Sequence, residues 1–234
     1  MKVISWNLLR RTGAAVRHVA ALIEHERPDL MLMQEATKDM EALPTLAGGH
    51  FHRLPWASRI HGLAVWSPRP LAAPRSLPLP ASRLPGRLPR RVSQIVQVDD
   101  MLFANVHLSH GQLLNRRQLA RIAMALHGHP AAIIGDYNAV GPIVMSGFRD
   151  VGPRMATHFA SNVVPFRLDR CLVRGLRCTE ARALDFGPSD HRPIVLHLEA
   201  QPASVWPRRH RIIDPASALG KRIARIRSRF QADR

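Results

Sequence analysis

Residues 2–8 (KVISWNL) and residues 29–35 (DLMLMQE) are two short apolar runs that flank a helical pattern, and they decide the fold. Each run is too short for a helix and has the length of a buried strand. Between them, apolar side chains recur every three or four residues, at Val16, Val19, Ala20 and Ile23. This spacing predicts an amphipathic helix over residues 14–26, which Pro28 ends because the residue before a proline disfavours helical backbone. We therefore interpret the first 35 residues as a βαβ unit.

The alternation of strand and helix continues along the chain. Short apolar runs predict further strands at residues 62–66, 92–98, 101–108, 131–135, 168–173 and 192–198. A second helix is predicted over residues 112–127, where the apolar residues at helical spacing are Leu119, Ile122, Ala123 and Leu126. Strands that alternate with helices are typical of an α/β fold.

Two basic segments depart from this pattern. Residues 68–91 hold seven prolines and six arginines without an acid, which predicts a long basic loop rather than a helix or an interior strand. Residues 201–234 hold nine basic and two acidic residues. We expect one domain over residues 1–200 and a basic tail over 201–234, partly helical because Leu219, Ile223, Ile226 and Phe230 recur at helical spacing.

The charge of the 234-residue chain indicates a polyanionic partner. Lys and Arg number 34 against 17 Asp and Glu, a net charge of +17. Nucleic acid is the partner we expect, and an anionic membrane is the alternative, although an arginine-rich coding bias would give the same composition. The apolar runs are too short to span a bilayer, the N-terminus carries no secretory leader pattern, and the two cysteines cannot form a disulfide framework. These features predict a cytoplasmic protein, and we expect a monomer.

Polar residues stand at the ends of the predicted strands, where they could meet at one edge of a sheet. Asn7, Glu35, His107 and Asp136 stand at the C-terminal ends of their strands, whereas Asp169 and Asp190-His191 stand at the N-terminal ends of theirs. One shared site therefore requires the last two strands to run opposite to the first four, in a mixed sheet. Clustered carboxylates repel one another unless a cation offsets them, and oxygen ligands without thiolates suit Mg²⁺, or Mn²⁺ in its place. Such an ion serves phosphoryl transfer to water.

These clusters, in this order, resemble the endonuclease/exonuclease/phosphatase superfamily with the deoxyribonuclease I-like fold. The resemblance runs from Lys2 to about Leu198 and implies a four-layer α/β sandwich with two mixed β-sheets. Read singly, the GDYN stretch at 135–138 could be a turn and the SDH stretch at 189–191 a cap, and the assignment depends on all the motifs occurring in family order.

The resemblance also implies roles for individual residues. Glu35, Asn7 and Asp190 are expected at the metal, and Asp136 with Asn138 at the attacking water and the phosphate. His191 is expected to meet the scissile phosphate, with Asp169 orienting it. Which of Asp136 and His191 is the general base is left open. The expected substrate contacts are Asn138, His191 and the Asn-x-His pair, Asn105 and His107, although His107 could instead be a structural strand-end histidine.

The expected function is therefore a Mg²⁺-dependent phosphoester hydrolase, most simply a phosphodiesterase acting on nucleic acid. A phospholipid, sphingomyelin or phosphoinositide hydrolase at a membrane is the alternative. A non-enzymatic polyanion-binding adaptor is a third reading, but it would require the loss of a catalytic residue, and none is lost. With 5% aromatic residues, the sequence displays no stacking platform for single strands.

Overall fold

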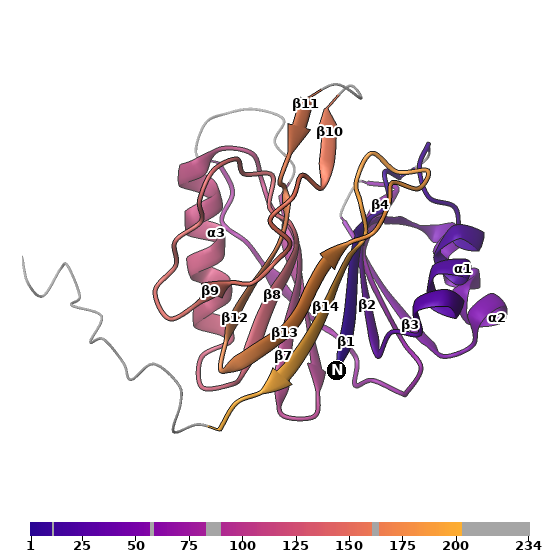
Figure 1. Ribbon diagram of the computed structural model, residues 1–234, viewed down its shortest axis with the longest axis horizontal. Helices are drawn as coiled ribbons and strands as arrows, with labels where there is room; N and C mark the ends of the chain where they lie inside the picture. Colours follow the sequence, from indigo (N-terminus) through magenta and orange to yellow (C-terminus); the bar gives the residue numbers. More distant parts are fainter. Residues whose placement is uncertain (11, 57–58, 83–89, 161–163, 203–234) are drawn as a thin grey trace, which may run out of the picture.

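Two six-stranded sheets lie face to face, and helices cover their outer faces (Figure 1). The structure is a computed structural model that describes residues 1–10, 12–56, 59–82, 90–160 and 164–202. The layers run from α1 and α2, through the two sheets, to α3 on the far side. The predicted four-layer α/β sandwich is confirmed.

The first sheet is built around the N-terminal βαβ unit and has the order β13-β14-β1-β2-β4-β3. Only β1 and β2 are parallel, so the sheet is mixed. Its strands are β1 (Lys2–Asn7), β2 (Leu30–Thr37), β3 (His50–Pro55), β4 (His61–Ser67), β13 (Leu176–Ala183) and β14 (Ile194–Ala200). Its outer face is covered by α1 (Val16–Glu26), the 3₁₀ turn η1 (Lys38–Ala42) and α2 (Leu43–Ala47).

The second sheet repeats this plan with the order β5-β6-β7-β8-β12-β9, in which only β7 and β8 are parallel. Its strands are β5 (Arg75–Pro78), β6 (Val92–Val98), β7 (Met101–His107), β8 (Ala131–Asp136), β9 (Arg149–Asp150) and β12 (Asp169–Arg174). Helix α3 (Gln112–Ala125) joins β7 to β8, and a separate hairpin consists of β10 (His158–Ala160) and β11 (Val164–Phe166).

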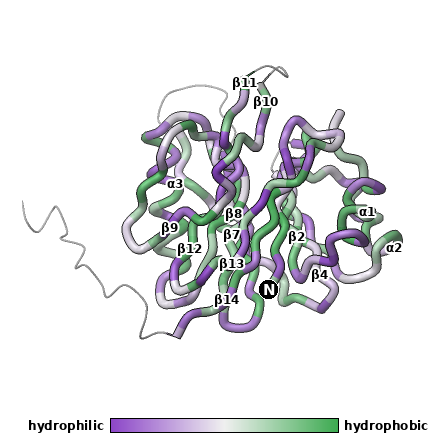
Figure 2. Tube along the Cα trace, viewed as in Figure 1, coloured by the Kyte–Doolittle hydropathy of each residue, from purple (hydrophilic) through white to green (hydrophobic). Residues whose placement is uncertain are grey.

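The cores explain why the central strands read as continuous apolar runs. Between the sheets pack residues such as Leu32, Phe103 and Ile134, while Ile4 and Met31 face α1 and Ile133 faces α3. Figure 2 shows these strands as hydrophobic stretches in the middle of the molecule. A strand with both faces covered loses the usual alternation, and burial of each large side chain contributes roughly 1.5–3 kcal/mol.

The strands reach the site edge in the directions that the sequence predicts. The parallel pairs β1–β2 and β7–β8 end at the upper edge in Figure 1, and β12 and β14 begin there because they run antiparallel to β8 and β1. The last strand therefore delivers Ala200 to the opposite edge, beside Leu176.

Two predictions about the connecting segments have different outcomes. The proline-rich stretch at 68–91 is not all loop, because Arg75–Pro78 forms edge strand β5; an edge strand tolerates Pro78, which has no N–H to donate. The basic tail lies outside the described residues beyond position 202. Among the residues described, no helix has the length and apolar character needed to cross a membrane.

Candidate functional site

Asp136 is the centre of the site, at the end of β8. A glycine precedes it because a Cβ on Gly135, whose φ is 142°, would lie 2.1 Å from the carbonyl oxygen of Val106 on β7. The carboxylate is buried and accepts hydrogen bonds from the backbone N–H of Asn138 (2.8 Å) and from the side chains of Asn7 (3.0 Å) and Asn138 (3.2 Å). Burial raises the pKa of Asp136, while these donors oppose the rise.

His191 lies between two buried carboxylates. Its Nδ1 is 2.8 Å from Asp169 Oδ2, and its Nε2 is 3.9 Å from Asp136 Oδ2. Asp136 and Asp169 are register partners on β8 and β12, so the sheet itself fixes the two acids around the ring. Burial alone would lower the pKa of His191, but Asp169 and Asp136 raise it to about 10. The structure thus joins Asp136, Asp169 and His191 as the family resemblance implies.

His107 approaches the same carboxylate from β7. Its Nε2 is 3.4 Å from Asp136 Oδ2, whereas its buried Nδ1 has no hydrogen-bond partner among the described residues. Burial and the nearby cation of Arg91 lower its pKa well below the usual range. His107 therefore faces Asp136 as a neutral imidazole.

Asn7 and the SDH segment are joined by hydrogen bonds between residues far apart in the sequence. Ser189 Oγ donates to the Asn7 carbonyl (2.7 Å) and accepts from the His191 N–H (3.1 Å). Trp6 Nε1 donates to the His191 carbonyl (2.9 Å). These bonds hold residues 189–191, which precede β14, against the end of β1. They thereby place His191 beside Asp136.

Glu35 is turned toward the site by a bulge in β2. The register with β4 shifts between Gln34 and Ala36, and Glu35 has a φ of 56°. Such bulges redirect a side chain and recur beside active sites. Its Oε2 is buried without a hydrogen-bond partner in the described structure, with Arg10 Nε 3.8 Å away, and burial raises the pKa of the carboxyl. An unpartnered carboxylate oxygen near further oxygen donors fits a hard divalent cation.

Asp190 belongs to a second group of potential ligands, which includes His191. Its nearest ligand-type neighbours are His158 and His191, and the three residues offer nitrogen and oxygen atoms within 4.8 Å of one another. His158 Nδ1 is 3.7 Å from Asp190 Oδ2, and the rings of His158 and His191 are 4.3 Å apart. Asp190 Oδ1 is also buried without a hydrogen-bond partner in the described structure.

Asn105 is not at the surface of the site. It is completely buried between the sheets, where its Nδ2 donates to Met33 O (3.1 Å), Ala64 O (3.0 Å) and Gln94 Oε1 (3.0 Å), and its Oδ1 accepts from Gln34 Nε2 (2.8 Å). All of its polar capacity is used within the protein. The structure thus assigns Asn105 to the joint between the sheets and corrects the expectation that it contacts substrate.

Three residues that the sequence analysis did not place in the site flank His107. Trp56 packs against the rings of His61 (5.1 Å) and His107 (5.4 Å), and the Arg91 guanidinium lies 4.5 Å over the Trp56 ring. Arg91 is buried and interacts favourably with Asp136 and Glu35. Burial and the surrounding arginines lower the pKa of His61 to about 4. Nothing in the local sequence marks Arg91, which is one of six arginines in its stretch.

The comparisons with known proteins identify the family of the chain. Residues 4–191 match the model of the endonuclease/exonuclease/phosphatase family, so the chain belongs to that family. Members of this family are phosphoester hydrolases and generally use divalent metal ions. No curated protein matches the chain.

Solved structures share the fold at low sequence identity. An endonuclease/exonuclease/phosphatase from Bacteroides vulgatus has a TM-score of 0.71 at 14% identity, covering 86% of this chain and 98% of that one. An endonuclease/exonuclease/phosphatase from Beutenbergia cavernae has a TM-score of 0.66 at 20% identity, covering 87% and 72%. Truncated Caenorhabditis elegans TDP2 has a TM-score of 0.62 at 16% identity, covering 85% and 97%. At these identities the likeness shows the fold alone.

Proposed function

We propose that this protein is a Mg²⁺-dependent phosphodiesterase acting on nucleic acid. The observation that carries the proposal is the geometry around Asp136, whose buried carboxylate lies 3.4 Å from His107 Nε2 and 3.9 Å from His191 Nε2, with Asp169 2.8 Å from His191 Nδ1. The net charge of +17 supports a polyanionic substrate, because basic side chains attract the phosphate backbone.

The chain's own residues divide the work by their positions. Asp136 orients the attacking water and accepts its proton, since its carboxylate is held by Asn7 and Asn138 and its pKa is raised by burial. His191, fixed by Asp169, donates a hydrogen bond to a nonbridging phosphate oxygen and offsets its charge. Asn138 holds the Asp136 carboxylate from its backbone N–H and its side chain, and His107 faces the same carboxylate through Nε2.

Glu35, Asn7 and Asp190 are the residues we assign to Mg²⁺. The unpartnered oxygens of Glu35 and Asp190 have the chemistry that such an ion requires. When bound, the ion stabilises the charge that develops on the phosphate and its leaving oxygen.

A hydrolysis assay tests the proposal. Wild-type protein with Mg²⁺ is incubated with single-stranded and duplex DNA, RNA, sphingomyelin vesicles and inositol phosphates. We expect cleavage of a nucleic acid, its loss in EDTA, and its loss in Glu35→Gln with the fold retained. Full activity in EDTA contradicts the metal assignment, and turnover of a lipid or inositol phosphate without nucleic acid contradicts the substrate.

A further inference from the structure

The β10–β11 hairpin is fixed beside the catalytic His191 rather than projecting freely. Phe159 N donates to the Asp190 carbonyl (3.2 Å), Arg192 N donates to the Thr157 carbonyl (2.7 Å), and His158 and His191 form an antiparallel bridge. In Figure 1 the hairpin rises above the edge at which the parallel strands end. Residues 157–159 at the base of the hairpin therefore lie beside the SDH segment.

These contacts bring together flat groups that lie far apart in the sequence. On one face of β10 the His158 ring lies 4.3 Å from the His191 ring. Phe159, the next residue along β10, points to the opposite face because side chains alternate along a strand. There it forms a row of three flat groups, in which Phe159 meets the Phe186 ring edge-to-face at 4.9 Å and the Arg192 guanidinium lies 4.4 Å over Phe186. Phe159 and Phe186 are 27 positions apart in the sequence and remain partly exposed.

Arg192 gives this row a charge that no acid offsets. Among the described residues its guanidinium forms no salt bridge, its NH1 contacts only the Met155 sulfur at 3.9 Å, and its buried Nε has no hydrogen-bond partner. A flat guanidinium can stack on a base and also bind a phosphate. The row thus combines the two features that bind unpaired nucleotides, aromatic faces and an unneutralised cation.

We infer that Phe159, Phe186 and Arg192 form a stacking subsite for an unpaired nucleotide beside the SDH segment that carries His191. This inference rests on the proposed nuclease function and names its preferred substrate as a single strand or an unpaired end. The sequence displays no such platform, because Phe159 and Phe186 come together only in the folded chain.

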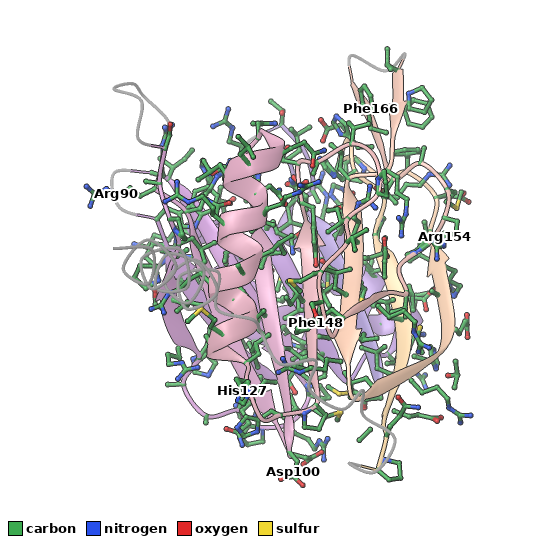
Figure 3. All side chains as sticks on the ribbon, turned by 90° about the vertical axis from the view of Figure 1, so that its left-hand side faces the viewer. Arg90, Asp100, His127, Phe148, Arg154 and Phe166 are labelled. Atoms are coloured by element: carbon green, nitrogen blue, oxygen red, sulfur yellow. The ribbon has the colours of Figure 1, made fainter. Side chains whose placement is uncertain are left out.

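Binding measured without turnover separates the subsite from the activity. The Kd of a fluorescent single-stranded oligonucleotide is measured by anisotropy in EDTA for the wild type, Phe186→Leu and Arg192→Leu. Phe148→Leu is the matched control, because Phe148 lies under Arg174 (4.8 Å) in the same kind of pair but away from the site, lower in Figure 3 than the hairpin residue Phe166. Hydrolysis is assayed separately, so a protein that binds but does not cleave contradicts the proposed function and leaves the subsite supported.

Phe186→Leu should weaken binding about 5- to 150-fold, the range that one stacked base supplies, at every salt concentration. Arg192→Leu should weaken it too and reduce the log–log salt slope by about 0.7, the value for one phosphate contact on a single strand. The fully paired duplex should bind with little change in either variant. Losses equal to those of Phe148→Leu, equal losses on duplex and single strand, or a loss confined to anionic phosphatidylserine vesicles would each overturn the inference.

Discussion

His107 and His191 approach the same carboxylate oxygen of Asp136, yet their surroundings shift their pKa values in opposite directions. Their Nε2 atoms lie 3.4 and 3.9 Å from Asp136 Oδ2, and both rings are buried. The difference is at Nδ1, where His191 meets Asp169 at 2.8 Å and His107 has no hydrogen-bond partner in the described structure. Asp169, which contacts His191 at Nδ1, therefore raises the pKa of His191, and His107 has no corresponding partner in the described structure.

The surroundings of each histidine reinforce this division. The His107 flank holds the buried cation of Arg91 stacked on Trp56, which disfavours a second positive charge. The His191 flank holds Asp190 as well as Asp169, which favour it. Pairs of titratable groups whose environments separate their pKa values mark the acid and base roles of a site.

Removing the Asp169 carboxylate should have the largest effect, because it removes the difference between the two histidines. In Asp169→Asn, burial still lowers the pKa of His191 but the main opposing charge is gone, so His191 becomes neutral like His107. We expect kcat to fall about 10²- to 10⁴-fold, as for the loss of an acid–base or charge-stabilising group. Steady-state kinetics on one oligonucleotide measure this. Asp185→Asn, an exposed carboxylate just before the SDH segment, is the control; an unchanged kcat in Asp169→Asn would show that the pair is not coupled.

Asn105→Ala should destabilise the packing between the two sheets beneath His107. The substitution leaves Met33 O, Ala64 O and Gln34 Nε2 without their buried partner. We expect a loss of about 2–4 kcal/mol in unfolding free energy and a Tm lower by about 5–15 °C. Thermal unfolding measures it against Gln97→Ala, an exposed amide on the neighbouring strand β6. A Tm equal to that of the control, with reduced substrate affinity, would restore Asn105 as a substrate contact.

His107→Asn tests whether a neutral donor is all that this flank supplies. An asparagine amide can also donate to Asp136, so we expect kcat to fall by about 10-fold or less, with no new group in the pH profile. The comparison with His191→Asn at equal pH sharpens the result. Equal losses in the two variants would mean that His107 also acts as an imidazolium.

His61 should make the protein less stable in acid. Its pKa in the folded state is about 4, below the unfolded value near 6.5, so the unfolded chain binds more protons between these values and stability falls as pH falls. His61→Asn should therefore lose about 2 kcal/mol less than the wild type between pH 7 and pH 5. Urea unfolding at the two pH values measures this, and parallel losses would place the His61 pKa near its ordinary value.

The sequence predicts the central strands well, but it predicts the edge strand β13 and the contacts around His107 poorly. β1, β2, β7 and β8 are covered on both faces and therefore read as apolar runs. β13 (LRCTEARA) is an edge strand with several exposed residues, so it carries no such signal. Arg91 and Trp56 meet only because β6 begins beside the segment before β4, a contact between segments that no local pattern encodes.

The position of Asn105 follows from the strand pattern of residues 101–108. Side chains alternate along a strand, so Asn105 shares a face with Phe103 and His107. Two residues before the strand end, it lies roughly 6–7 Å deeper than His107. Strand periodicity therefore places Asn105 between the sheets, where the structure has it, rather than in contact with substrate.

The different protonation of the two histidines is tested most directly by NMR of ¹⁵N-histidine-labelled protein across pH. The variants His107→Asn and His191→Asn assign the signals. We predict that His191 keeps both ring protons beyond pH 8, with a pKa near 10, while the pKa of His107 lies well below its ordinary value of 6.5. If both rings titrate near pH 6.5, or if His107 is the ring that keeps its proton, the account of the site is contradicted.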